Sequence, residues 1–161
     1  MAAVDYFLKI DGIPGESTDH KHKDEIDVSS WSWGVTQSGT HAYGGGGGAG
    51  KSAHGDLHFT MRISKASPKL HLACATGEHI KKAVLTCRKA GKEQQEYLKV
   101  TFTDVLVSSY QASGSEREIV PVEQCALNFA KIEFSYQTQK SDGTLEGAVK
   151  SAYDVKAAKA S

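Results

Sequence analysis

Apolar and polar residues alternate along most of this chain, a pattern typical of β-strands that bury one face. The run from position 57 to position 63 alternates without interruption. Its apolar members, which we expect to lie in the core, are Leu57, Phe59, Met61 and Ile63. Further strands are expected at residues 4–10, 25–36, 80–88, 97–110, 119–122, 125–137 and 145–153. The pattern therefore predicts a protein built mainly from β-strands.

The segment 25–36 changes the phase of its alternation part-way along. Its apolar residues lie at even positions up to Val28 and at odd positions from Trp31 onward. A slip of one residue moves every later side chain to the opposite face of a strand. We therefore expect a β-bulge near Ser29-Ser30.

Two tryptophans share one face of the second half of this segment. Paired aromatic rings bury a large apolar area, so we expect Trp31 and Trp33 to pack in the core. Ser32 lies between them and must point the other way, toward solvent, a partner subunit or a shared lumen.

Residues 67–77 carry the signals of one short helix. Ser67 is a candidate N-cap, Pro68 suits the first helical position, and Gly77 suits a left-handed stop. The apolar stripe of this helix is Leu70, Ala73 and Cys74. Many strands, one helix and glycine-rich connections favour a closed or nearly closed β-barrel, with a sandwich as the alternative. At 161 residues, the chain is expected to form a single domain over positions 1–161.

The glycine-rich stretch 45–52 matches the phosphate-binding pattern G-x-x-x-x-G-K-[ST] letter for letter. In nucleotide-binding proteins this loop follows a buried strand and precedes a helix whose N-terminus faces the phosphate. We expect neither the strand nor the helix here. Residues 38–43 do not form an apolar strand, and the predicted strand 57–63, not a helix, follows the glycine-rich stretch. The nearest candidate for a magnesium-holding aspartate, Asp104, lies in an alternating strand. We prefer an exposed, adaptable loop and keep nucleotide binding as the alternative.

The charge balance gives no reason to expect a nucleic-acid or membrane partner. Lys and Arg number 19, as do Asp and Glu, so the formal net charge is zero. Asp5 and Lys9 interrupt the first ten residues, and no apolar run reaches transmembrane length, so we expect neither a signal peptide nor membrane insertion. The cysteines Cys74, Cys87 and Cys125 are odd in number and widely spaced, which indicates buried free thiols in a reducing cytosol.

Candidate metal-binding and catalytic groups are present but poorly arranged. The histidines that lie two or four residues apart are His20 with His22, and His54 with His58. Neither pair is accompanied by further ligands at zinc spacing, so we expect ordinary solvated histidines. Cys74 could pair with His71 on the helix or with His79, but a thiol in an apolar stripe is unreactive. We therefore expect no metal, no cofactor and no enzymatic activity.

Two N-terminal segments resemble the signatures of a known family. Residues 5–17, DYFLKIDGIPGES, and residues 25–34, EIDVSSWSWG, are similar to the opening signatures of the haemolysin co-regulated protein (Hcp) family. The glycine-rich loop 38–52, the segments 65–68 and 88–91, and residues 127–136 follow in the family's order. The resemblance covers almost the whole chain and is weakest over the C-terminal end.

This resemblance implies a two-sheet β-barrel with one short flanking α-helix, assembled into six-membered rings that stack as the inner tube of a type VI secretion apparatus. It further implies export with the tube from the cytoplasm, contacts with the spike, sheath and baseplate, and carriage of small effector proteins in the ring lumen. Ser32 becomes the candidate lumen-lining, effector-contacting residue. The loop that would reach the adjacent ring comprises Gly44, Gly45, Gly46, Gly47, Gly48, Ala49, Gly50 and Lys51. The family's toxic members carry C-terminal extensions, and since this chain ends at Ser161 we do not expect a toxin.

Overall fold

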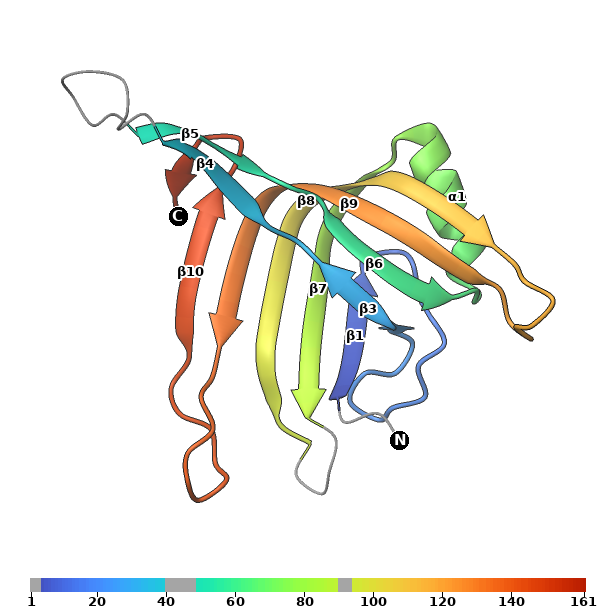
Figure 1. Ribbon diagram of the computed structural model, residues 1–161, viewed down its shortest axis with the longest axis horizontal. Helices are drawn as coiled ribbons and strands as arrows, with labels where there is room; N and C mark the ends of the chain where they lie inside the picture. Colours follow the sequence, from blue (N-terminus) through green and yellow to red (C-terminus); the bar gives the residue numbers. More distant parts are fainter. Residues whose placement is uncertain (1–3, 40–48, 90–93) are drawn as a thin grey trace.

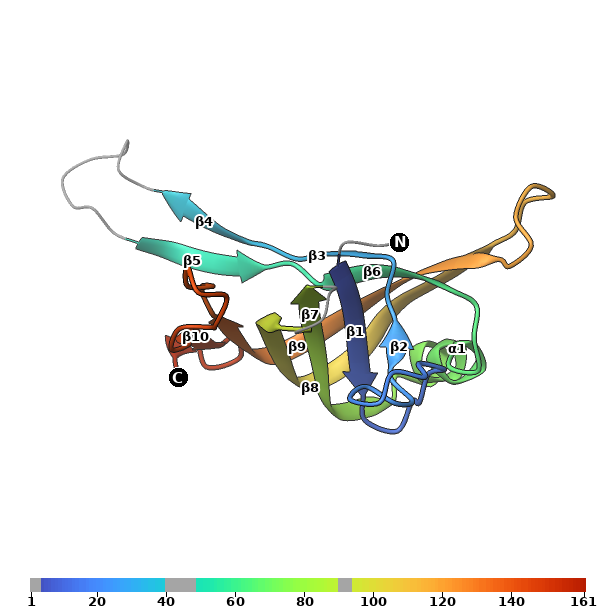
Figure 2. The same ribbon diagram turned by 90° about the horizontal axis from the view of Figure 1, so that it is seen from below.

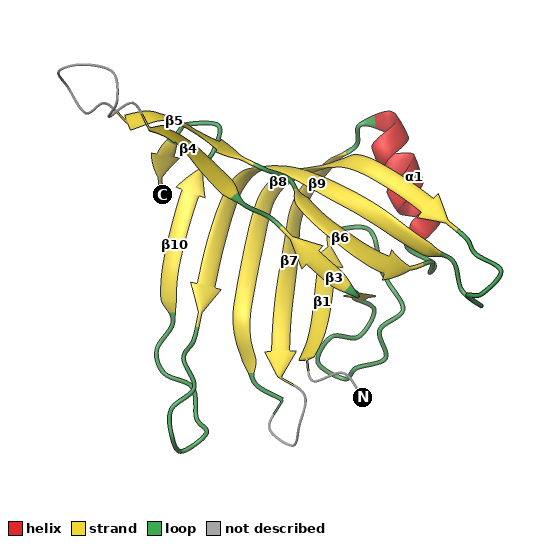
Figure 3. Ribbon diagram, viewed as in Figure 1, coloured by secondary structure: helices red, strands yellow, loops and turns green. Residues whose placement is uncertain are grey.

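The computed structural model describes residues 4–39, 49–89 and 94–161, which form a mainly β structure with one helix (Figure 1, Figure 3). The strands are β1 Val4–Ile10, β2 Ile26–Asp27, β3 Ser30–Ser32, β4 Val35–Gly39, β5 Ala49–His54, β6 Leu57–Arg62, β7 His79–Lys89, β8 Glu96–Ser113, β9 Val122–Tyr136, β10 Val149–Asp154 and β11 Lys159–Ala160. The helix α1 spans Ser67–Thr76. The predicted fold class, mainly β with one short helix, is confirmed.

Most strands belong to one antiparallel sheet with the order β11-β10-β9-β8-β7-β1-β2. One edge of β9 is shared, because its first half pairs with β6 and its second half with β10. β6 pairs in turn with β3, while β4 and β5 form a separate two-stranded sheet. The large sheet curves so that β3 and β6 lie across from β7 and β8 and close to β1 (Figure 2).

This sheet does not close into a barrel, so the predicted barrel needs correction. The short strands β2 and β3 are separate, β2 pairing with β1 and β3 with β6. Between them the backbone N–H of Val28 donates to the Tyr6 carbonyl (3.0 Å), and that of Ser29 donates to the Thr60 carbonyl (2.8 Å). The predicted phase change near Ser29-Ser30 is therefore the point where the chain changes partner, not a bulge within one ladder.

Of the four apolar residues predicted to lie in the core along the strand 57–63, three are buried. Leu57, Phe59 and Met61 are buried. The expectation for Ile63 is wrong, because β6 ends at Arg62 and Ile63 lies at the exit of the strand, 37% exposed.

Trp31 and Trp33 lie at the margin of the core and are half-buried. The Trp31 ring meets Tyr6 edge-on at a centroid distance of 6.1 Å, and the Trp33 ring meets Phe134 at 5.6 Å. Both tryptophans pack against the buried cluster without being enclosed by it.

The helix ends as the sequence predicts but begins differently. Gly77 adopts the expected left-handed conformation, with φ of 68°. The N-cap is Ala66, and Ser67 is a helical residue whose hydroxyl donates to the buried Glu123 carboxylate at 2.9 Å. Tyr110 donates to the same carboxylate at 2.5 Å, and burial together with this carboxylate raises the pKa of Tyr110 to about 12. The Ser67 hydroxyl therefore ties α1 to β9 and is not used as a cap.

Two of the strand expectations and one loop expectation need correction. Residues 119–122 do not form a strand of their own, and Ile119 is fully exposed in the turn between β8 and β9. The last predicted strand, 145–153, begins only at Val149. Both ends of the expected loop 38–52 belong to paired strands, because β4 continues to Gly39 and β5 begins at Ala49.

A buried arginine fastens the loop 11–25 to the large sheet. The Arg88 side chain is 3% exposed, and its Nη2 lies 3.0 Å from an Asp5 oxygen and 2.7 Å from an Asp19 oxygen. The Arg88 guanidinium holds the pKa of Asp19 far below its usual range. Burial raises the pKa of Asp27, and the nearby negative charges of Asp5 and Asp19 raise it further.

His22, expected to be solvated, is buried in the same loop. Its ring stacks on Phe7 at a centroid distance of 4.3 Å. Its Nδ1 lies 2.8 Å from the Glu25 carboxylate, and its Nε2 lies 2.6 Å from that of Glu96 on β8. Glu96 is distant in sequence, so the pattern around His22 gave no sign of this contact.

Candidate functional site

The clearest surface for contact with a partner crosses β3, β6, β9 and β8, which are neighbours in this order. Ser30 on β3 lies opposite Thr60 on β6. Thr60 lies opposite Gln124 on β9, and Gln124 lies opposite Gln111 on β8. Directly opposed residues of antiparallel strands project on the same face. Four polar side chains therefore form a continuous row across four strands.

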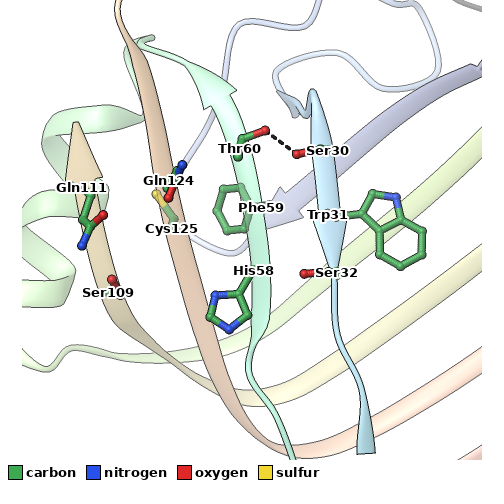
Figure 4. A pocket seen from close by; sticks show the side chains of 10 residues that line it. All are labelled: Ser30, Trp31, Ser32, His58, Phe59, Thr60, Ser109, Gln111, Gln124 and Cys125. Carbon is green, nitrogen blue, oxygen red and sulfur yellow. Dashed lines mark hydrogen bonds between the residues drawn. The ribbon is translucent and has the colours of Figure 1, made fainter. Parts of the chain in front are cut away.

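A second row lies one strand repeat away on the same face. Ser32 is opposite His58, His58 is opposite Ala126, and Ala126 is opposite Ser109. Ala126 is buried and interrupts the second row. We call the polar residues of the two rows, residues 30, 32, 58, 60, 109, 111 and 124, the polar wall. A hollow of about 410 Å³ lies over the polar wall (Figure 4).

The side chains of the polar wall are hydroxyls, primary amides and one imidazole, with no carboxylate, lysine or arginine among them. The hydroxyls of Ser30 and Thr60 lie 2.6 Å apart, within hydrogen-bond distance. Trp31 points to the opposite side of β3 from Ser30 and Ser32 (Figure 4). This confirms the alternation on which the outward position of Ser32 depends.

Charged residues flank the polar wall at both ends of β6. Asp56 precedes the strand and accepts hydrogen bonds from the Ser108 hydroxyl (2.6 Å) and the Asn128 amide (2.9 Å). Arg62 ends the strand and is exposed. The face therefore runs from an acidic end, through uncharged hydroxyl and amide groups, to a basic end.

The chemistry of this surface suits contact with a polypeptide better than catalysis. Hydroxyls and primary amides both donate and accept hydrogen bonds, so they can meet many backbone and side-chain groups. Of its residues, the sequence indicated Ser32 as a candidate contact residue and His58 only as a candidate metal ligand. The others alternate with buried neighbours in the sequence, but nothing local indicates which strands bring them side by side.

The proposed ring-stacking loop is only partly described. Gly44, Gly45, Gly46, Gly47 and Gly48 lie outside the described residues. Gly50 and Lys51 lie in β5, which pairs with β4 in a ribbon that projects from the body (Figure 2). An added Cβ at Gly50 would come within 2.5 Å of the Ser38 carbonyl oxygen, so the two strands approach closely there.

The nucleotide-binding alternative lacks its structural setting. Lys51 and Ser52, the last two residues of the pattern, belong to strand β5, where a phosphate site needs the first turn of a helix. Asp104, the candidate magnesium ligand, is exposed on β8 and lies 3.3 Å from His79.

The cysteines are free thiols in the described part of the chain. Burial raises the pKa of Cys87 to about 11 and that of Cys125 to about 12, which makes both thiols poor nucleophiles. Cys74 is half-buried, and His71 packs against the Tyr110 ring at a centroid distance of 6.1 Å. Among the described residues, no group of three potential metal ligands is found, and no helix is long and apolar enough to cross a membrane.

Comparison with known proteins shows one family throughout. A family described as "Type VI secretion system effector, Hcp" matches residues 7–136. Protein hcp1 of Pseudomonas aeruginosa is 49% identical over 146 residues, covering 90% of either chain. The crystal structure of Hcp1 from Salmonella typhimurium is 40% identical and superposes with a TM-score of 0.82 over 99% of this chain and 100% of that one. Another solved type six secretion system protein, 28% identical, superposes with a TM-score of 0.93 over the same shares.

The chain belongs to the Hcp family of type VI secretion proteins. The resemblance in the N-terminal signatures is thereby confirmed. The Hcp match runs from within β1 to the end of β9, so it includes all four strands of the polar wall. β10 and β11 lie beyond the matched residues.

Proposed function

We propose that this Hcp protein is a structural subunit of the type VI secretion tube, assembled as stacked six-membered rings whose lumen is lined by the polar wall. The polar wall is the observation that carries the proposal, because it places seven hydroxyl, amide and imidazole side chains across four strands of an Hcp fold. A lumen that holds varied cargo needs hydrogen-bonding groups that do not select one sign of charge.

The surface charge and symmetry rules support ring assembly. A closed ring requires head-to-tail contacts in which one face of a subunit meets a different face of the next. Zero net charge lets identical copies pack without accumulating repulsion. Exposed apolar side chains at distant points, among them Leu72, Ile119 and Val149, provide area that neighbouring subunits can cover.

In this proposal the ring carries small effector proteins in its lumen, where Ser32 contacts them, and the β4–β5 ribbon with its glycine-rich loop meets the adjacent ring. The tube forms in the cytoplasm, meets the spike, sheath and baseplate, and leaves the cell with its cargo.

Ring formation is tested by electron microscopy and light scattering of the purified protein. We expect annular particles with an open centre and a mass about six times the 17.3 kDa of the chain. A monomer at every concentration would contradict the proposal.

The lumen assignment is tested by replacing Ser32 with Gln. The longer side chain would narrow the lumen once in each subunit, so we expect intact rings that recover roughly tenfold less effector in co-purification. Ser141→Gln, at an exposed serine remote from the polar wall, is the matched control and should recover effector normally. Equal recovery by both variants would exclude Ser32 from the cargo surface.

Lys51→Ala separates the tube function from nucleotide binding. We expect this variant to form rings as the unchanged protein does, because Lys51 lies in the strand β5 and not at the first turn of a helix, where a phosphate site would need it. Nucleotide binding that is lost in Lys51→Ala would favour the alternative.

A further inference from the structure

The β4–β5 ribbon, residues Val35–Gly39 and Ala49–His54, is a structure that needs support. It forms its own sheet, and β4 is exposed along its whole length. Two-stranded ribbons are marginally stable in water unless they pack against something else. Contacts between the ribbon and the body therefore decide whether it is ordered and in which direction it projects.

Tyr153 on β10 provides such a contact through two residues of β5. The His54 ring stacks on the Tyr153 ring, with centroids 5.0 Å apart and planes 19° from parallel. The Ser52 hydroxyl lies 3.4 Å from the Tyr153 hydroxyl. Since Ser52 and His54 are two residues apart on a strand, both project from the same face of the ribbon. The His54 ring also meets the core residue Phe129 edge-on at 6.4 Å.

Tyr153 is held firmly by its own strand. It pairs with Ile132 of β9 on one side and with Ala160 of β11 on the other. At the base of the ribbon its two strands stay paired, since the Gly55 N–H donates to the Gly34 carbonyl at 2.9 Å. The views agree that the C-terminal strands lie beside the ribbon where it leaves the body (Figure 1, Figure 2).

We propose that Tyr153 and His54 form a bracket that sets the direction of the β4–β5 ribbon, and that this direction makes rings competent to stack. The second half of this inference rests on the proposed tube function, whereas the first concerns the single chain. It gives a role to β10, which carries Tyr153, and to β11, which pairs with β10. Tyr153 and His54 are positioning residues, since they act on the neighbouring ring only through the ribbon.

The bracket depends on ring packing and not on the imidazole nitrogens. His54 Nδ1 is buried and has no hydrogen-bond partner among the described residues. Replacing His54 with Phe keeps an aromatic ring and removes this unpaired atom, which is neutral or favourable. Replacing His54 with Ala removes the ring itself.

Trypsin offers a direct measure of ribbon order. Lys51, in β5, is the only lysine or arginine between Lys23 and Arg62. Cleavage after Lys51 requires the paired strand to open locally. The stacked aromatic pair stabilises the closed ribbon, so Tyr153→Ala and His54→Ala should raise the cleavage rate roughly three- to tenfold. Tyr153→Phe and His54→Phe keep the stacked rings and should leave the cleavage rate near that of the unchanged protein.

The same four variants are then examined as rings. Ring mass should be preserved in all of them. Stacking into tubes, scored by electron microscopy, should be lost only in the two alanine variants. The bracket would be refuted if both alanine variants were cleaved at the rate of the unchanged protein. It would also be refuted if, at each position, the Ala and Phe variants were cleaved at equal rates. Faster cleavage in the alanine variants with unchanged ring stacking would refute the role of the bracket in the tube. Failure of the unchanged protein to form rings would instead refute the proposed function, and the cleavage rates would still decide the bracket.

Discussion

Individual charged residues of this protein owe their behaviour to the buried cluster around Arg88. Asp19 and Asp27 are both carboxylates, yet their pKa values move in opposite directions. Asp19 accepts a hydrogen bond from Arg88, so its charged form is favoured. Asp27 lies at an exposed position of β2, where partial desolvation and the negative charges of Asp5 and Asp19 raise its pKa, so its charged form is disfavoured. The outcome for each residue is decided by its partner and its burial.

This contrast predicts opposite pH effects for two matched substitutions. The pKa of Asp19 is lower in the folded protein than in the unfolded chain, so its contribution to stability is present above about pH 4 and is lost as the pH falls below that value. The pKa of Asp27 is raised on folding, so its charge opposes folding at neutral pH and its protonation relieves this as the pH falls.

Asp19→Asn should therefore lower the free energy of unfolding at pH 7 by about 1–3 kcal/mol and flatten its decline in acid. Asp27→Asn should leave the stability at pH 7 unchanged or raise it. Urea unfolding between pH 3 and pH 7 measures both. A stability loss at pH 7 that is larger for Asp27→Asn than for Asp19→Asn would contradict the assignment.

At the scale of elements, the β4–β5 ribbon is set apart from the rest of the fold. It shares no strand with the large sheet, and its two strands come so close at Gly50 that a side chain does not fit there. Gly39 lies in the same ribbon with open space where a Cβ would be. The close approach of the two strands thus requires glycine at position 50 but not at position 39.

Gly50→Ala should disrupt pairing within the ribbon while the large sheet stays intact, because the new Cβ would meet backbone atoms of Ser38. Gly39→Ala is the matched control and should be tolerated. Hydrogen exchange of the β4 and β5 amides should accelerate roughly tenfold or more in Gly50→Ala alone. Equal protection in the two variants would show that the strands can separate to admit the methyl group.

At the scale of the whole molecule, the uncharged polar wall predicts how cargo binding depends on salt. Interactions between exposed charges weaken as salt screens them, but hydrogen bonds between uncharged groups do not. Effector retained by purified rings should therefore change less than about twofold between low and high salt. Retention measured by co-purification across a salt series tests this. A steep loss would place the cargo contacts on the flanking charges of Asp56 and Arg62 instead.

Much of the fold was predictable because strand alternation and helix signals are local properties of the sequence. The strand 57–63, the first strand, the left-handed stop at Gly77 and the outward position of Ser32 each follow from a few adjacent residues. Errors arose where a distant partner decided the outcome. Ser67 turned from its expected cap toward Glu123, and His22 is buried by contact with Glu96.

The sequence by itself determined the strand-rich class, the single helix and, through its two N-terminal signatures, the family. Only the tertiary structure decided that the sheet stays open, that serines, glutamines and a histidine from four strands align as one wall, and that Tyr153 packs beside His54. The physical reason is the range of the interactions. Alternation depends on the geometry of neighbouring residues, whereas strand order and register depend on the packing of segments that the sequence keeps far apart.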